Sequence, residues 1–322
     1  MKISKVTNIY LEIKKYYKQT QINIHKMEIT FLGTTSMVPT KERNHIATFI
    51  NYGSEGILID CGEGTQRQMK ISGIKVTKVT KILISHWHGD HILGLPGLIQ
   101  TMAASEYNGV LEIYGPVGIK KRIKDIFDVF IFDKNIQIKV KEIKKKKFYD
   151  GKYFYLEALE LSHGIKCFGF NFIEKDHRRI NIRKIKELGI PECPLLGKLQ
   201  ENKSIVFKGK KITPEETTYV VKGKKITIIS DTLVCKNCYE LSKDADLLIC
   251  EASYKSDLEE KAQEYKHLTA KQAAQIASIS NVKRLILTHI SARYKDPKEI
   301  EEDAKQIFDN VVVAYDLMKV KV

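Results

Sequence analysis

Four apolar, strand-like segments of this sequence each end directly in a residue that can bind a metal ion. The residues at these ends are His86, His163, Asp231 and His289. Side chains at strand ends can converge on one rim of a sheet, where open backbone leaves room for ligands. Four endings of this kind therefore indicate one site that is assembled from distant parts of the chain.

The first of these endings opens a dense cluster of possible ligands, His86-Trp87-His88-Gly89-Asp90-His91. In an extended segment residues i and i+2 point to the same side, so His86 and His88 can bind one ion. Gly89 then allows the backbone to turn, so that Asp90 and His91 can face a second ion. A lone histidine is usually structural, but three of the nine histidines fall within these six residues, which favours a metal site.

The remaining strand ends can complete two sites. Imidazole and carboxylate are the natural ligands of zinc where thiolates are absent. Asp231 can bridge two ions because its carboxylate has two oxygens. Two ions about 3.5–4 Å apart can share a water molecule and lower its pKa toward about 7, which generates a hydroxide. We therefore predict a hydrolase with two Zn²⁺ per subunit, for which phosphodiesters are especially suitable substrates. Mn²⁺ and Fe²⁺ are alternatives that accept the same ligands.

The charge of the chain favours a polyanionic partner. The formal net charge is +15 and the pI is near 9.3 over 322 residues. Such a balance is typical of nucleic-acid-binding proteins, although a basic proteome or simple solubility explains it equally well. The length allows one large domain or two ordinary ones.

The sequence also indicates where the protein resides. No apolar run approaches the roughly 18 residues of a membrane span, and the first residues do not resemble a secretory signal, so no membrane partner is expected. The six cysteines are scattered, as in a protein of the reducing cytosol, and we expect a cytoplasmic location. Cys235 and Cys238 form a lone Cys-x-x-Cys motif. Without a second pair, ordinary packed thiols are a better interpretation than a zinc knuckle.

Three regions of the chain differ in composition and in hydrophobic pattern. Residues 1–26 are rich in Lys, Tyr and Ile and read as an N-terminal extension of uncertain role. From residue 27 short strands follow one another, which predicts an antiparallel-rich sheet. Capping patterns predict helices that begin near Thr269 and near Asp296-Pro297. Residues 173–217 are charged, hold three of the seven prolines and read as an insertion.

The run His86-x-His88-x-Asp90-His91 resembles the signature of the metallo-β-lactamase superfamily. This resemblance implies an α+β fold, a four-layer αββα sandwich with metals at one edge of its two sheets. Further motifs resemble one family within it, ribonuclease Z, the endonuclease that removes 3′ trailers from precursor tRNA. These motifs are Phe31-Leu32-Gly33-Thr34, Pro39-Thr40-Lys41-Glu42-Arg43-Asn44, residues 58–68 and 86–97, Ser230-Asp231-Thr232, Glu251-Ala252-Ser253, His267-Leu268-Thr269-Ala270 and residues 288–294. The resemblance spans 27–322.

The resemblance implies a role for each matching residue. One ion would be held by His86, His88 and His163, and the other by Asp90, His91 and His289, with Asp231 bridging. Asp90 would also accept a proton from the attacking water. His267 would lie near the scissile phosphate and protonate the leaving 3′ oxygen, with Glu251 orienting it. The alternatives are a loop histidine that only packs and a structural glutamate.

The resemblance also implies how the substrate is bound. Lys41, Arg43 and Asn44 would lie in a loop near the tRNA acceptor end, and Arg293 near the same end. The 173–217 insertion would be a protruding, flexible arm that grips the elbow of the tRNA bound to the partner subunit, which implies a homodimer. One departure is Cys193, which stands where the family usually has glycine.

We therefore predict an endonuclease that cleaves precursor tRNA after the discriminator nucleotide. The tRNA would keep a 3′-OH and the trailer a 5′-phosphate. One rival is another hydrolase of the superfamily, acting on a thioester or a cyclic nucleotide. A second rival is a nucleic-acid-binding protein with an inactive site, but all seven expected ligands are present.

Overall fold

The computed structural model describes residues 27–131 and 135–322. The predicted N-terminal extension, 1–26, lies outside the described residues. Two compact units make up the described chain. The larger unit comprises residues 27–173 and 224–322, and the smaller unit comprises residues 174–223. Within the described ranges, no helix combines the length and the apolarity that crossing a membrane requires.

The first sheet of the larger unit has seven strands in the order β18-β1-β2-β3-β4-β5-β6. These strands are β1 (Met27–Gly33), β2 (Ala47–Tyr52), β3 (Glu55–Ile59), β4 (Lys81–Leu83), β5 (Val110–Gly115), β6 (Gln137–Glu142) and β18 (Lys319–Lys321). The pairs from β18 to β3 are antiparallel, whereas β3, β4, β5 and β6 run parallel. The carboxyl ends of these four parallel strands therefore share one edge.

The second sheet also has seven strands, in the order β17-β16-β15-β14-β9-β8-β7. These are β7 (Lys147–Asp150), β8 (Phe154–Leu161), β9 (Cys167–Glu174), β14 (Lys225–Ile229), β15 (Leu247–Glu251), β16 (Leu285–Thr288) and β17 (Val311–Val313). Strands β14 to β17 are parallel, and β9 is antiparallel to β14. Both sheets are therefore mixed. The prediction of an antiparallel-rich sheet was wrong for the parallel half of each sheet, β3 to β6 and β14 to β17.

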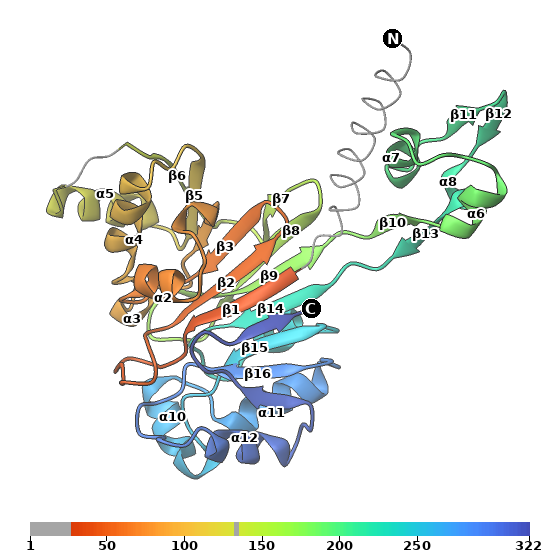
Figure 1. The fold of residues 1–322 in the computed structure, drawn as a ribbon. Coiled ribbons are helices and arrows are strands. Elements are labelled where there is room, and N and C mark those ends of the chain that lie inside the picture. Colours follow the sequence, from red (N-terminus) through yellow and green to blue (C-terminus); the bar gives the residue numbers. More distant parts are fainter. Residues whose placement is uncertain (1–26, 132–134) are drawn as a thin grey trace. The chain divides into compact units, whose positions relative to one another are not determined.

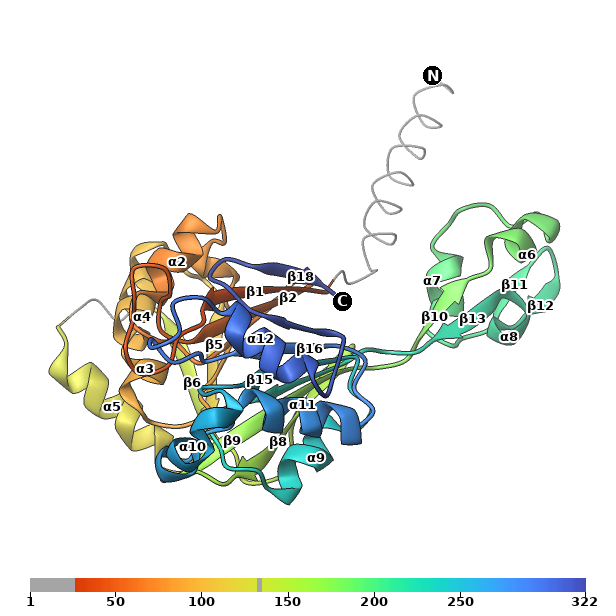
Figure 2. The ribbon, with the colours of Figure 1, turned by 90° about the horizontal axis from the view of Figure 1, so that it is seen from below.

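Helices cover the outer face of each sheet (Figures 1 and 2). On the first sheet lie α2 (Thr65–Ile71), α4 (Leu95–Ala104) and α5 (Ile119–Val129), and on the second α9 (Lys236–Ser242), α11 (Ala270–Ile279) and α12 (Lys298–Lys305). Shorter helical elements are η1 (Val76–Lys78), α3 (Gly89–Ile92), η2 (Ser256–Leu258) and α10 (Glu259–Tyr265). The predicted α+β, four-layer αββα sandwich is confirmed.

The alternation of side chains along the strands creates these layers. In β1, Ile29 and Phe31 are buried in the core between the two sheets, whereas Leu32 faces the outer core under the helices. In β16, Ile286 joins the central core and Leu287 the opposite outer core. Each sheet is therefore largely apolar on both faces, with few buried polar residues, among them Thr227, whose hydroxyl donates to Asn171 at 2.7 Å.

Local capping signals set two of the helices near the site. Helix α11 begins after Thr269, whose side chain and that of Gln272 form the predicted capping box. Helix α12 begins at Lys298, one residue later than predicted, and Asp296 accepts a hydrogen bond from the Lys298 backbone N–H at 3.0 Å. Pro297 is then the N-cap residue.

The smaller unit has a core of its own. Its elements are β10 (His177–Ile180), α6 (Ile182–Glu187), α7 (Leu195–Gln200), β11 (Ile205–Phe207), β12 (Lys210–Ile212), α8 (Pro214–Thr217) and β13 (Thr218–Val221). Six buried apolar residues form the core, namely Ile185, Ile190, Leu196, Leu199, Ile205 and Ile212. Its limits differ from the predicted 173–217, because β13 pairs with β10 and residue 173 belongs to β9 of the large sheet.

Candidate functional site

The four strand ends meet at one edge of the larger unit. His86 follows β4 of the first sheet, while His163, Asp231 and His289 follow β8, β14 and β16 of the second sheet. Their ligand atoms fall into overlapping groups together with His88, Asp90 and His91. The structure therefore brings all seven sequence-predicted metal ligands together, although they are spread over some two hundred residues of sequence.

The first group consists of His86, His88, His163 and Asp231, each with one ligand atom within 4.8 Å of the others. Nδ1 of His88 lies 3.1 Å from Nε2 of His86 and 3.2 Å from Nε2 of His163. Nε2 of His86 lies 3.6 Å from Oδ2 of Asp231. Three imidazole nitrogens and one carboxylate oxygen thus converge on one point.

The second group consists of Asp90, His91 and His289. Oδ2 of Asp90 lies 3.3 Å from Nε2 of His289 and 3.5 Å from Nε2 of His91. Asp231 contacts this group as well, because its Oδ1 is 3.4 Å from His289 Nε2 and its Oδ2 is 3.5 Å from His91 Nε2. Asp231 therefore lies between the two groups and is shared by both.

The residues of both groups fit a divalent cation. Nε2 of His91 and Oδ1 of Asp231 are buried and have no hydrogen-bond partner. Leaving such atoms unpaired in a protein interior costs about 1–3 kcal/mol each, a cost that a bound cation would offset. A hollow of about 20 Å³ is lined by His91, Asp231 and His289, which is room for one ion or one water molecule. Together with the His/Asp donor set, these features identify a divalent metal site.

Electrostatics keep Asp231, Asp90 and His86 in the forms that bind a cation, whereas His91 must lose a proton to do so: burial lowers its pKa, but the charges of Asp231 and Asp60 raise it well above its usual value. Burial raises the pKa of Asp231, but the neighbouring imidazoles of His289 and His91 hold that pKa well below its usual range. Burial also raises the pKa of Asp90, but the hydrogen bond with His289 and the charge of His91 lower it below its usual value. Burial and the neighbouring His91 lower the pKa of His86, so this imidazole is neutral at neutral pH.

Hydrogen-bonding groups behind the histidines orient their rings. His91 donates through Nδ1 to Oδ2 of Asp60 at 2.8 Å, and Ser85 donates to the same carboxylate through its hydroxyl and its backbone N–H. The Ser85 hydroxyl also lies 3.0 Å from Nδ1 of His86. With Nδ1 engaged, Nε2 of each ring is directed at the metal groups, which is the usual arrangement around a metal.

Two further contacts complete this support. The Ser253 hydroxyl lies 3.0 Å from Nδ1 of His289, and His163 donates through Nδ1 to the Lys266 carbonyl at 3.0 Å. Sequence reasoning missed Asp60 and Ser253 as supporting residues. Asp60 carried a usable signal, because it ends the apolar run Ile57-Leu58-Ile59 just as the four chosen residues end theirs. Ser253 carried no such signal.

His267 lies beside the shared carboxylate and is held by Glu251. Its Nδ1 is 3.1 and 3.2 Å from the two carboxylate oxygens of Glu251, so the contact expected between these residues is present. Glu251 is fully buried and also accepts hydrogen bonds from the Thr232 backbone N–H and the Ser253 hydroxyl. Burial lowers the pKa of His267, but the charges of Glu251 and Asp231 raise it to about 9. The imidazole is therefore protonated at neutral pH.

His267 also has an alternative role. Its ligand atom groups with Asp231 and His289 in a third possible metal cluster. The distance from Nδ1 of His267 to Oδ2 of Asp231 is 3.9 Å. Geometry alone therefore permits either an acid held by Glu251 or a metal ligand.

The predicted substrate loop divides into exposed and buried residues. Lys41 is exposed. Arg43 is only 9% exposed, and its Nη1 donates to the Thr34 hydroxyl at 2.7 Å and to the Ala314 carbonyl at 2.9 Å. Asn44 donates through its side chain to the Glu63 carbonyl at 2.6 Å. Arg43 therefore fastens the loop to the C-terminal segment and does not present its charge at the surface.

Arg293 is connected to the site through one aromatic ring. Its side chain is exposed, and its guanidinium lies over the Tyr254 ring at 5.2 Å. The Tyr254 ring in turn lies 6.2 Å from that of His267, measured between ring centres. Arg293 and His267 are therefore both neighbours of Tyr254.

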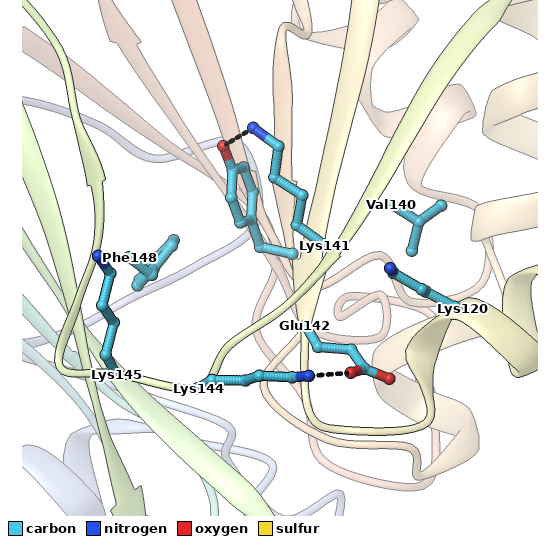
Figure 3. A pocket seen from close by; sticks show the side chains of 8 residues that line it. Lys120, Val140, Lys141, Glu142, Lys144, Lys145 and Phe148 are labelled. Carbon is cyan, nitrogen blue, oxygen red and sulfur yellow. Dashed lines mark hydrogen bonds and ion pairs between the residues drawn. The ribbon is translucent and has the colours of Figure 1, made fainter.

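A larger cavity, of about 530 Å³, lies elsewhere in the larger unit (Figure 3). Its lining consists of Tyr114, Lys120, Val140, Lys141, Glu142, Lys144, Lys145 and Phe148. Lys144 is paired with Glu142 at 3.4 Å, and Lys141 donates to the Tyr114 hydroxyl at 3.1 Å. This lining contains no histidine, cysteine or aspartate, so the chemistry belongs to the smaller hollow among the histidines.

Known proteins resemble this chain at two levels. Residues 27–127 match a family model described as Anti-Pycsar protein Apyc1, which covers less than a third of the chain. In fold, the metallo-beta-lactamase fold protein YhfI from Bacillus subtilis is similar over 92% of this chain and 100% of its own, with a TM-score of 0.68 and 16% identity. This second likeness concerns the fold alone.

Relatives of higher identity share one name. A ribonuclease Z of Archaeoglobus fulgidus is 42% identical over 302 residues, which are 92% of this chain and 97% of the relative. A ribonuclease Z of Methanothermobacter thermautotrophicus is 41% identical over 92% of this chain and 97% of the relative. The crystal structure of the short form of human tRNase Z matches 91% of this chain and 98% of its own with a TM-score of 0.67 and 28% identity. The chain therefore belongs to the ribonuclease Z family.

Proposed function

We propose that this protein is a metal-dependent endoribonuclease that removes the 3′ trailer from precursor tRNA. It hydrolyses the phosphodiester after the discriminator nucleotide, so that the tRNA keeps a 3′-OH and the trailer a 5′-phosphate. The observation that carries the proposal is the position of Asp231, shared by two groups of histidines with His267 beside it, in a chain of this family. A shared carboxylate between two metal groups suits phosphodiester hydrolysis especially well.

We propose that two Zn²⁺ ions are held in each subunit. His86, His88 and His163 would hold one ion, Asp90, His91 and His289 the other, and Asp231 both. Mn²⁺ and Fe²⁺ accept the same donors. When bound, such ions supply a hydroxide at neutral pH and stabilise the charge that develops on the phosphate.

Asp90 and His267 would carry out the proton transfers of the reaction. The carboxylate of Asp90 is ionised, since its pKa lies below the usual range, and it would accept the proton of the attacking water. His267 is held through Nδ1 by Glu251, which leaves Nε2 as the atom that donates a proton to the leaving 3′ oxygen. Glu251 has no exposed surface, so its charge stabilises the protonated imidazole effectively.

Positive charge supports the choice of tRNA as partner. The net charge of the chain is +15, and Lys41 and Arg293 are exposed. Lysine and arginine contacts to phosphates release counterions, so binding should weaken steeply with salt. We assign Arg43 to holding the loop in place, and Asn44 to the same loop. The proposed substrate also argues for a cytoplasmic location, which a fluorescent fusion of the full chain would test.

The cleavage itself is the direct test. Purified full-length protein is incubated with a precursor tRNA that carries a 3′ trailer, and both product ends are mapped. We expect one cut after the discriminator nucleotide, a 3′-OH on the tRNA and a 5′-phosphate on the trailer. Bis(p-nitrophenyl) phosphate serves as a small phosphodiester control. Turnover of a thioester or of a cyclic nucleotide without any cleavage of RNA would refute the proposal.

We further propose that residues 174–223 grip the elbow of the tRNA that is cut by the partner subunit of a homodimer. This unit carries many basic residues, among them Lys175, Arg178, Arg179, Arg183, Lys184 and Lys186. Its two ends are close together, because the Gly223 backbone N–H donates to Asp176 at 3.0 Å and Lys225 pairs with Ile173 in the large sheet. A short glycine-serine linker can therefore replace the unit without opening that sheet.

A mixing experiment tests the arm and the dimer together. One subunit lacks residues 176–221 and has an intact site, while the other keeps the arm and carries Asp231→Asn. Each variant alone should be inactive on precursor tRNA, whereas co-refolded mixtures should regain cleavage because the arm of one subunit serves the site of the other. The arm-deleted protein should hydrolyse bis(p-nitrophenyl) phosphate like the wild type. Mixtures that remain inactive, or a monomer in sedimentation, would contradict the proposal.

A further inference from the structure

Two cysteines outside the metal site form a close pair. Sγ of Cys235 and Sγ of Cys238 are 3.5 Å apart, and the Cys238 backbone N–H donates to the Cys235 carbonyl at 3.0 Å to close the turn between them. Cys235 is half-buried and Cys238 is buried. The two thiols are thus packed against each other.

The two thiols differ in reactivity. The pKa of Cys235 is lowered to about 5, mainly by the hydrogen bond from the Cys238 thiol. Burial opposes this shift, and hydrogen bonds from backbone N–H groups add to it. The same contact and burial raise the pKa of Cys238. A partly exposed thiolate beside a buried, protonated thiol is the combination found where thiol–disulfide exchange occurs.

The surroundings of the pair do not favour a metal ion. None of the groups of three or more possible metal ligands within residues 27–131 and 135–322 includes Cys235 or Cys238. A structural zinc requires four donors, so a dithiol alone does not supply a site. Thiol–disulfide exchange needs only the two sulfurs of the pair, so it fits these surroundings better than metal binding does.

We propose that Cys235 and Cys238 form a redox-active dithiol that reacts with low-molecular-weight disulfides. The Cys235 thiolate attacks one sulfur of the disulfide, which breaks the S–S bond, releases one thiolate and leaves a mixed disulfide on Cys235. The Cys238 thiol then transfers its proton to the released thiolate and attacks Sγ of Cys235, which expels the second thiolate to be protonated from solvent. The pair is oxidised by two electrons and the disulfide is reduced to two thiols.

The geometry permits the internal disulfide with little movement. The sulfurs need to approach from 3.5 Å to about 2.05 Å within one existing turn. Contacts around the pair fix its position, since Asn237 donates to the Glu160 carbonyl at 2.7 Å and Leu233 donates to the Ser162 carbonyl at 2.8 Å. The disulfide would therefore join Cys235, the N-cap residue of α9, to Cys238 in the first turn of that helix.

The test uses the full-length protein, reduced and then equilibrated in mixtures of reduced and oxidised glutathione before alkylation. Mass spectrometry should show an internal disulfide in the peptide with Cys235 and Cys238, and a reductant should reverse it. In Cys238→Ser a glutathione adduct should accumulate on Cys235, whereas Cys235→Ser should show neither product. At slightly acidic pH, iodoacetamide should modify Cys235 at least about tenfold faster than Cys193, the other half-buried cysteine.

Cys193→Ser is the matched control, because it removes a half-buried thiol that belongs to the smaller unit. It should leave the internal disulfide unchanged. Absence of that disulfide in the wild-type protein at every glutathione ratio would overturn the proposal, and so would equal alkylation rates at Cys193 and Cys235. The wild-type measurement decides the question even if a serine variant fails to fold.

Discussion

Replacing Asp231 by asparagine is expected to remove bound divalent metal and to lower precursor-tRNA cleavage by at least about 10³-fold, the scale of losing a preorganised charge at a reacting centre. Asp231 is the only predicted ligand whose carboxylate faces both metal groups in the described residues: Oδ2 lies 3.6 Å from Nε2 of His86 in the first group, and Oδ1 lies 3.4 Å from Nε2 of His289 in the second. Asparagine keeps the shape but replaces one oxygen by an NH₂ group and removes the negative charge. Both groups should therefore bind a cation more weakly.

The measurement combines metal content after dialysis, cleavage rate and tRNA binding. Binding should persist in Asp231→Asn, because the proposed phosphate contacts lie on other residues. Asp303→Asn is the matched control, since Asp303 is a buried aspartate that accepts hydrogen bonds from Ser256 and contacts no metal group. Asp303→Asn is expected to keep metal and activity. An Asp231→Asn protein that retains both would exclude the shared-carboxylate role, and an inactive wild type with bound metal would support a purely RNA-binding protein.

The convergence of the metal residues could be predicted because it follows from short-range sequence patterns. An apolar strand buried on both faces offers room for a polar side chain mainly beyond its end, so a ligand-type residue at that end lies on the rim of the sheet. The rule identified His86, His163, Asp231 and His289 as members of one site. Applied without exception, it would also have found Asp60 and Glu251, which end β3 and β15 and support His91 and His267.

The role of Arg43 could not be predicted, because it depends on contacts across the whole chain. The sequence places a charged residue in a loop, where solvent and phosphate are the expected neighbours. Its guanidinium instead contacts the carbonyl of Ala314, 271 residues away in sequence. The limits of the smaller unit were missed for a related reason: the pairing of Arg179 with Tyr219 joins two segments that lack any local pattern of their own.

Replacing His267 by glutamine is expected to lower the cleavage rate by about 10²–10⁴-fold, the range for a general acid, without loss of metal. Nδ1 of His267 is fixed by Glu251 at 3.1 Å, and the resulting protonated imidazole has Nε2 available for the leaving 3′ oxygen. Because the protonated form is the active one, the wild-type rate should fall as pH rises past the pKa of His267. That alkaline limb should disappear in His267→Gln. Glu251→Gln should move the limb to lower pH, because the charge that raises the pKa is gone.

A substrate with a sulfur leaving group separates the acid role from the ligand role. In a precursor tRNA whose scissile linkage carries 3′-sulfur in place of 3′-oxygen, the departing thiolate needs no proton. His267→Gln should therefore cleave this substrate almost as fast as the wild type, whereas Asp231→Asn should remain inactive on both substrates. If His267 is instead a metal ligand with Asp231 and His289, its replacement will reduce the metal content and impair both substrates equally. Equal impairment together with metal loss would contradict the assignment of His267 as the acid.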